Sequence, residues 1–229
     1  MNKVNYALER FQEMKAERDP WNPHYQAVAE LAYTREATFT STKNPGAFLQ
    51  EDIYDNTLQH ATDLLASVLK SLLWPDAERT LVVEPADNLK KVQGAEAYFQ
   101  WVTEQMRAHM GNSKAGLDLA MGEHFSEQTK LGISALVTHD NDDPHLPLSY
   151  DCWGCKAIYI DENAQGMVDT VYYRDEMTAR QMVAEYGEKN VSEKVREMVA
   201  KKKGAEKLEV LITIEPNKDY DKNKKGHEA

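Results

Sequence analysis

Cysteine, proline and glycine are scarce in this chain of 229 residues, which contains 2, 8 and 11 of them. Long hydrophobic runs are also missing. The best candidate, residues 58–74, contains His60, Asp63 and Lys70 and is too polar for a helix that crosses a membrane. The first residues, MNKVNYALERF, lack the apolar stretch of a secretory signal peptide. We therefore expect a soluble protein made in a reducing compartment, where both cysteines stay thiols.

Positive charge is in deficit, because 27 lysines and arginines face 38 aspartates and glutamates, for a net charge of −11. The chain thus lacks the overall basic character of a protein that grips nucleic acid. An acidic surface is still compatible with double-stranded DNA that passes without being bound tightly. Hydrophobic residues make up 41% of the chain, enough to bury a core, so we expect a folded chain rather than global disorder.

The first half of the chain is predicted to be helical, because apolar residues recur at spacings of three and four. A first helix ends before Asp19, which is expected to cap a second helix that starts at Pro20. Residues 36–50 lose this spacing and predict a loop. The clearest helix lies within residues 51–75, and its apolar stripe consists of Leu58, Ala61, Leu65, Val68 and Leu72.

Three more elements are predicted before Gly132. Residues 80–84, TLVVE, have the composition of a short strand. A helix is expected from about residue 90 to 110, and another from 117 to the glycine at 132.

After Gly132 the sequence changes to β-rich runs that predict a meandering antiparallel sheet. The runs are ISALVTH, LPLSYDC, KAIYIDE and MVDTVYYR, and ENAQG between the last two is a good hairpin loop. Thr178 and Gln181 have the spacing of a capping box, for a helix that ends at Gly187. Ser192 can start another helix, which the lysines at 201–203 close, and LEVLITIEP is a last strand.

These patterns predict an α+β fold with a helical N-terminal half, an antiparallel strand-rich segment over about 132–175, and then two helices and a strand. We expect a mainly helical region at residues 1–131, a strand-rich α+β region at 132–216 and a polar, disordered tail at 217–229. An alternative is one continuous domain over residues 1–216.

Both cysteines lie in the motif DCWGC, residues 151–155. A redox pair of the thioredoxin type needs its first cysteine at the start of a helix, whereas Cys152 and Cys155 lie between strand-like runs. With His139 and His145 they could form a zinc site, although the spacing fits no common zinc finger. The simpler interpretation is a strand and turn in which Trp153 packs and the two thiols stay reduced and unliganded.

Other candidate sites are weaker still. The loop DNDDP alternates aspartates but lacks the glycine and the closing glutamate of a calcium-binding loop. His124 has the position of a core histidine, and the remaining histidines in predicted helices are isolated: His24, His60 and His109. There is no phosphate-binding glycine loop and no nucleophile with a recognisable base. We therefore expect no catalytic, cofactor-binding or metal-binding residues and no enzymatic activity.

Four stretches carry a resemblance to a known family. They are RDPWNPHYQAVAELAYTR, IYDNTLQHATDLLASVLKSLLWP, HFSEQTKLGISALVTHD and DENAQGMVDTVYYRDEMTARQMVAEYG. The second matches the pattern D-x-T-x-x-x-A-x-x-L-A-x-x-L through Asp55, Thr57, Ala61, Leu65, Ala66 and Leu69. In order and spacing, the four resemble the N-terminal part of the head-to-tail connecting protein of short-tailed bacteriophages, also called the portal or connector.

The resemblance implies a structural virion protein at the portal vertex, assembled in the cytoplasm of the bacterial host, with a fold like the outward-facing wing of a portal. Members of the family form dodecameric rings around a channel through which double-stranded DNA is packaged and ejected, without sequence-specific binding. Its implied partners are other copies of itself, the capsid, the terminase motor and the tail proteins, with no membrane. Family members are usually more than twice as long as this chain. The chain is therefore expected to be a fragment of a longer protein, a truncated gene product or a short relative.

The leading hypothesis is therefore a portal subunit or its N-terminal portion. Two alternatives from other classes stay open. One is a small zinc-binding or thiol-redox module that uses His139, His145, Cys152 and Cys155. The other is a standalone α+β interaction domain.

Overall fold

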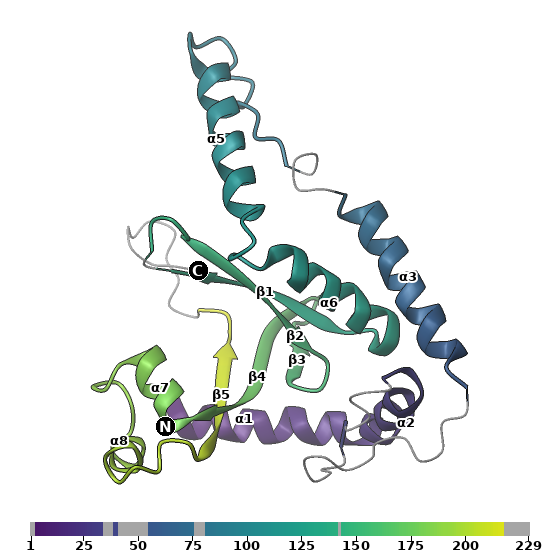
Figure 1. The fold of residues 1–229 in the computed structure, drawn as a ribbon, viewed down its shortest axis with the longest axis vertical. Helices are drawn as coiled ribbons and strands as arrows, with labels where there is room; N and C mark the ends of the chain where they lie inside the picture. Colours follow the sequence, from purple (N-terminus) through teal and green to yellow (C-terminus); the bar gives the residue numbers. More distant parts are fainter. Residues whose placement is uncertain (1–2, 34–38, 41–54, 76–80, 142, 218–229) are drawn as a thin grey trace. The chain divides into compact units, whose positions relative to one another are not determined.

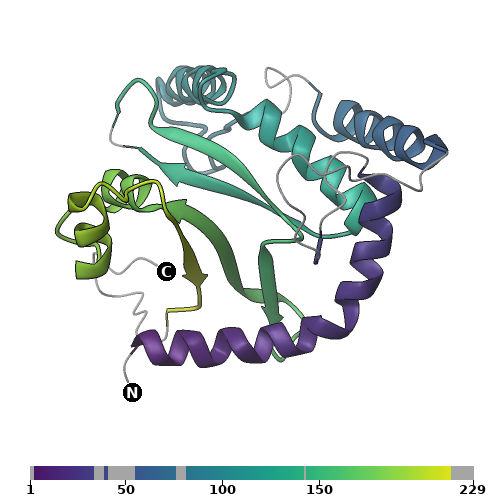
Figure 2. The same ribbon diagram turned by 60° about the horizontal axis from the view of Figure 1, so that its bottom comes forward.

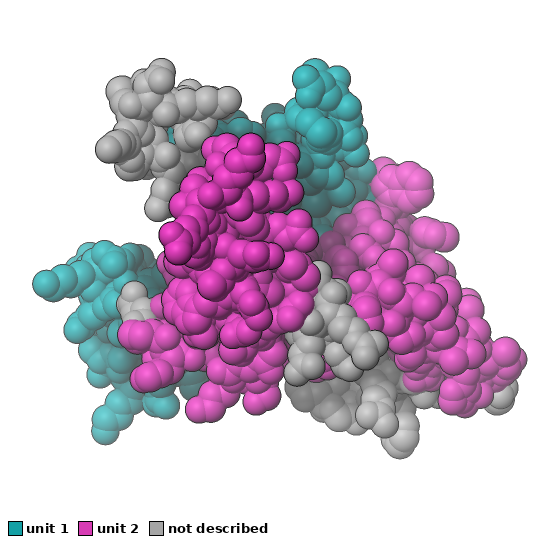
Figure 3. Space-filling view, turned by 90° about the horizontal axis from the view of Figure 1, so that it is seen from above, with its two compact units in different colours: residues 1–18, 157–229 teal, residues 19–156 magenta. Residues whose placement is uncertain are grey.

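The computed structural model describes residues 3–33, 39–40, 55–75, 81–141 and 143–217. These residues form a mixed α+β fold, with helices in the N-terminal half, then antiparallel strands, two helices and a strand, as predicted (Figure 1). They divide into two compact units, which Figure 3 shows in different colours. Unit 1 combines residues 1–18 with 157–229, and unit 2 comprises residues 19–156. The regions expected from the sequence, 1–131 and 132–216 or one domain over 1–216, stay predictions.

Unit 2 contains helices and a two-stranded sheet. Its longer elements are the helices α2 (Asn22–Ala32), α3 (Thr57–Leu73), α5 (Ala95–Met110) and α6 (Leu117–Leu131), and the strands β1 (Ser134–Asp140) and β2 (Leu148–Gly154). The strands pair antiparallel, with Leu136 opposite Cys152 and His139 opposite Ser149. Helix α6 packs against both strands and also against α2 and α3, so it is the central element of the unit (Figure 1).

Unit 1 is built on a three-stranded antiparallel sheet in the order β3-β4-β5, with bounds Ile158–Glu162, Val168–Thr178 and Lys207–Ile214. Helix α1 (Lys3–Arg18) packs against β3, which runs across the helix direction in Figure 2. Its Met14 is 3% exposed and contacts Tyr159 and the fully buried Tyr172. The helices α7 (Ala179–Tyr186) and α8 (Glu193–Ala200) enclose a second cluster around Ala179, Val191 and Val195.

Several local predictions are confirmed. Helix α1 ends at Arg18, directly before Asp19-Pro20, and the ENAQG segment closes the β3–β4 hairpin. Thr178 and Gln181 form the complete capping box of α7, which ends at Gly187. The hydroxyl of Ser192 accepts a hydrogen bond from the Val195 N–H at the start of α8.

Other local predictions are wrong in informative ways. Asp19 does not cap the second helix: residues Asp19–Trp21 form a 3₁₀ turn, and α2 starts at Asn22 with Pro23 in its first turn. The β-rich runs form two sheets rather than one meander. Helix α5 starts at Ala95, five residues later than predicted, because Gly94 has a φ of 86° that ends helical geometry there.

The predicted strand at residues 80–84 is also wrong for its described part, residues 81–84. Side chains of α5, rather than a neighbouring strand, form hydrogen bonds with the backbone of residues 81 and 83. The Val83 N–H donates to Thr103 Oγ1 over 3.0 Å, and Arg107 Nε donates to the Leu81 carbonyl over 2.9 Å. Of the predicted loop at 36–50, only residues 39 and 40 are described, as a bend, and residues 218–229 of the predicted tail lie outside the described residues.

Candidate functional site

The DCWGC segment ends strand β2 and continues into a turn. Trp153 and Cys155 are buried at 4% and 2% exposure, and Cys152 is half-buried. Cys155 packs in a cluster with Ala29 and Phe39, which Cys152 does not join. Both cysteines are free thiols. The segment therefore contributes mainly to the core of unit 2.

The four proposed zinc ligands do not form a site. His139 is exposed on β1, with its ring centroid 6.4 Å from that of Trp153, and His145 is exposed in the loop before β2. Within the described ranges, no three His, Cys, Asp or Glu side chains are grouped so that they could hold a metal ion. The arrangement gives the zinc alternative no support.

The environment of Cys152 also opposes nucleophilic thiol chemistry. Burial, followed by the charges of Glu127, Glu123 and Asp151, raises the pKa of Cys152 from 9.0 to about 12. A reactive cysteine needs a lowered pKa, because the thiolate is the nucleophile. Cys152 is thus a protonated thiol at neutral pH.

Glu127 on α6 organises the turn that follows Trp153. One carboxylate oxygen accepts the backbone N–H of Cys155 over 3.0 Å, and the other accepts the hydroxyl of Tyr33. Gly154 lets the carboxylate approach, since a Cβ there would lie 2.9 Å from Glu127 Oε2. This residue was not predicted, because a single glutamate on a helix carries no sequence signal for a partner 28 residues away.

Lys130, one turn further along α6, joins three helices. Its side chain is only 8% exposed, and its Nζ lies 2.8 Å from Asp63 Oδ1 of α3. The same ammonium donates to Ser126 Oγ over 3.0 Å and lies 4.6 Å from the ring centroid of Tyr33, which caps α2. Charge, hydrogen bond and cation–π contact are satisfied together, so this buried cation has a structural role.

His124 is half-buried on α6, with Ser134 Oγ 2.9 Å from its Nδ1. Burial lowers the pKa of His124, which favours the neutral ring at neutral pH. Its geometry is that of a core histidine that bonds the first residue of β1.

Helix α3 turns its apolar stripe outward. It packs on α6 through the opposite side, where Ala66 is buried and Lys70 pairs with Asp118 over 2.8 Å. The larger stripe residues are exposed at 45% for Leu58, 50% for Leu65, 42% for Val68 and 70% for Leu72. The sequence predicted the stripe but not its direction, since an apolar stripe usually faces the core.

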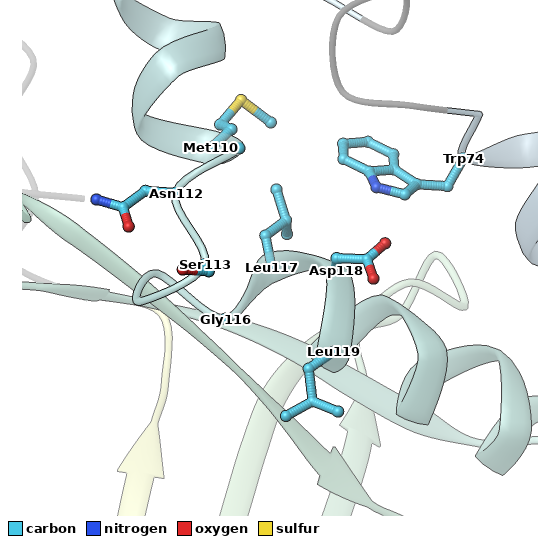
Figure 4. Close-up of a pocket in the computed structure, with 9 residues that line it drawn as sticks. Trp74, Met110, Asn112, Ser113, Gly116, Leu117, Asp118 and Leu119 are labelled. Atoms are coloured by element: carbon cyan, nitrogen blue, oxygen red, sulfur yellow. The ribbon is translucent and has the colours of Figure 1, made fainter.

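A pocket lies where α3 ends, α5 ends and α6 begins (Figure 4). Its volume is about 410 Å³, and Trp74, Met110 and Leu117 extend into it from the three elements. Asp118 and the exposed Leu119 complete this side. The mixed lining offers space for an apolar side chain but no arrangement of catalytic groups.

Comparison with known proteins shows which family this chain belongs to. The family model described as "Bacteriophage head to tail connecting protein" matches residues 5–229. The chain belongs to this family. The resemblance that the sequence motifs indicated is therefore confirmed, and the connector family is one of structural phage proteins.

A relative of this connector chain is named "Probable portal protein" and comes from Bordetella phage BPP-1. The two are 24% identical over 220 residues, which cover 95% of this chain and 39% of the relative. The connector chain thus spans well under half the length of that relative. In the described part of this chain, every helix is too short or too polar to span a membrane.

Proposed function

We propose that this connector chain is a subunit of a phage portal, or the N-terminal portion of one, and that it forms a ring around a DNA channel. The observation that carries the proposal is the family match over residues 5–229. The portal name of the BPP-1 phage relative supports it. The α+β fold is proposed to correspond to the wing of the portal.

The proposed partners are further copies of the chain, the capsid, the terminase motor and the tail proteins at the portal vertex of the virion. Double-stranded DNA is proposed to pass through the ring during packaging and ejection without sequence-specific contacts. A net charge of −11 suits that role, because a protein that neutralised many phosphates would hold the DNA rather than release it. The role is structural, with no catalysis.

The surface of unit 2 supports an assembly role. Large apolar side chains on α3 and α5 are exposed, including Leu72 at 70% and Tyr98 at 59%. Monomeric soluble proteins rarely expose large contiguous apolar patches, and such patches usually mark interaction sites. A ring subunit needs such contact surfaces and no reactive centre.

Two measurements test the proposal. Mass photometry and negative-stain imaging of the purified chain should show ring-shaped oligomers. Gold-labelled antibodies against the chain should mark a single vertex of opened particles of the phage that encodes it, whereas pre-immune antibodies should mark none. A chain that stays monomeric, binds no capsid protein and labels no vertex would contradict the proposal.

A further inference from the structure

The aliphatic face of α3 consists of Leu58, Ala61, Leu64, Leu65, Val68 and Leu72. Its five larger side chains are 42% to 70% exposed. The helix is already anchored on its other side, where Ala66 is buried and Asp63 and Lys70 pair with Lys130 and Asp118 of α6. Among the described residues, the α6 side of α3 is therefore occupied, whereas the aliphatic face lies outside this packing.

The size of this face is that of an interface component. At these exposures the five larger side chains present on the order of 500 Å² of apolar surface, at the upper end for a monomer. A stable complex buries about 800 Å² on each partner. The face supplies more than half of that area on one helix.

The charge of the face points to a second copy of the chain. The two charged residues of α3, Asp63 and Lys70, both pair with α6, so the aliphatic face carries no charged side chain. Two copies that each carry a net charge of −11 repel one another. Two such copies can meet at an uncharged face without bringing acidic side chains together. A basic partner would instead bind where acidic side chains are exposed.

Helix α5 presents an uncharged surface of a different kind. Its aromatic face consists of Tyr98, Trp101, Gln105 and Ala108, with Tyr98 59% and Trp101 55% exposed and their ring centroids 6.1 Å apart. The opposite side of α5 bonds residues 81 and 83 through Arg107 and Thr103. Tyrosine and tryptophan are enriched at protein interfaces, where they fill apolar surfaces of partners.

We propose that the aliphatic face of α3 in one copy binds the aromatic face of α5 in the next copy. The inference rests on the proposed function, because a portal ring needs a repeated contact between identical chains. Since the two faces differ, the contact is head-to-tail, and repetition around an axis can close a ring. The contact contains no ion pair, so higher salt strengthens it by screening the repulsion between acidic copies.

Two variants test both faces. Leu65→Glu with Leu72→Glu blocks α3, and Tyr98→Glu with Trp101→Glu blocks α5. Sedimentation velocity should show oligomers for the wild type and monomers for each variant alone. The dissociation constant for self-association should rise at least about tenfold in each variant. An equimolar mixture of the variants should form pairs and nothing larger, because one good contact per pair survives. Met167→Glu, at a 57% exposed apolar position of unit 1, is the matched control and should assemble normally.

Other outcomes overturn the inference. If the α5 variant still assembles alone, α5 is not the partner of α3, and if the α3 variant does, α3 is not in the contact. A photo-crosslinker is placed at Leu65, and chains labelled with ¹⁴N are mixed with chains labelled with ¹⁵N. Crosslinked peptide pairs should contain Trp101, with one peptide carrying ¹⁴N and the other ¹⁵N, which shows that the link joins two chains. Links within one chain, to another protein or to another surface overturn it. Circular dichroism checks that the variants are folded. Vertex labelling tests the proposed function separately, so that function can stand when this contact fails.

Discussion

A single carboxylate, Glu127, determines how the DCWGC segment leaves strand β2. It accepts the Cys155 N–H and the Tyr33 hydroxyl, and it needs the missing side chain of Gly154 to reach them. The sequence drew attention to the cysteines because they resemble metal and redox motifs. The residue that organises the segment is instead a glutamate on another element.

Glu127→Ala should lower the free energy of unfolding by about 2 kcal/mol, because a part-buried N–H and a hydroxyl lose their charged acceptor. Gly154→Ala should cost about 1 kcal/mol by displacing the same carboxylate. The double variant should cost less than the sum, since both changes remove one interaction. Urea unfolding measures this, with the exposed Gln128→Ala as control; additive effects would contradict it.

The thiol of Cys152 should be unreactive in the folded chain. Its pKa is raised to about 12, so very little thiolate exists at pH 8. Because this acid has a higher pKa when folded, its contribution to stability is complete below pH 9 and is lost as the pH rises toward 12. A thiol reagent at pH 8 should modify Cys152 slowly in the native chain and both cysteines rapidly in urea. Fast native modification of Cys152 would contradict this.

At the scale of elements, the helix α7 shows what local sequence can specify. Thr178 Oγ1 accepts the Gln181 N–H over 3.3 Å, and Gln181 Oε1 accepts the Thr178 N–H over 2.8 Å. Thr178→Ala should destabilise the fold by about 1 kcal/mol. Thr213→Ala on the exposed end of β5 is the control. Thermal unfolding followed by circular dichroism measures both, and equal effects would mean that the cap does not stabilise the helix.

Caps and hairpins were predictable because their partners lie within a few residues. The segment 81–84 was not, because α5 side chains from Thr103 and Arg107 bond its backbone where a strand partner was expected. The direction of the α3 stripe was not predictable either. Periodicity shows that a helix has an apolar side, but only the packing of Ala66 against α6 shows which side is already covered.

At the scale of the whole molecule, unit 1 joins the two ends of the described chain. Helix α1 packs on strands that follow it by about 140 residues: Phe11 meets Tyr159 with ring centroids 4.9 Å apart, and Arg18 donates to the Ile158 carbonyl over 2.6 Å. No periodicity in α1 indicates such a distant partner. The sequence therefore predicted the elements of unit 1 but not their assembly.

Met14→Ala should destabilise unit 1 by about 2–4 kcal/mol, because it leaves a cavity against Tyr159 and Tyr172. All four tryptophans lie in unit 2, at positions 21, 74, 101 and 153, so their fluorescence follows that unit. In urea, the far-ultraviolet circular dichroism should gain an early transition while the fluorescence midpoint stays close to that of the wild type. Leu8→Ala, at a 49% exposed position of the same helix, should change neither signal. If fluorescence and circular dichroism shift together, the two units unfold as one cooperative body, because the loss of packing in unit 1 then destabilises unit 2 equally.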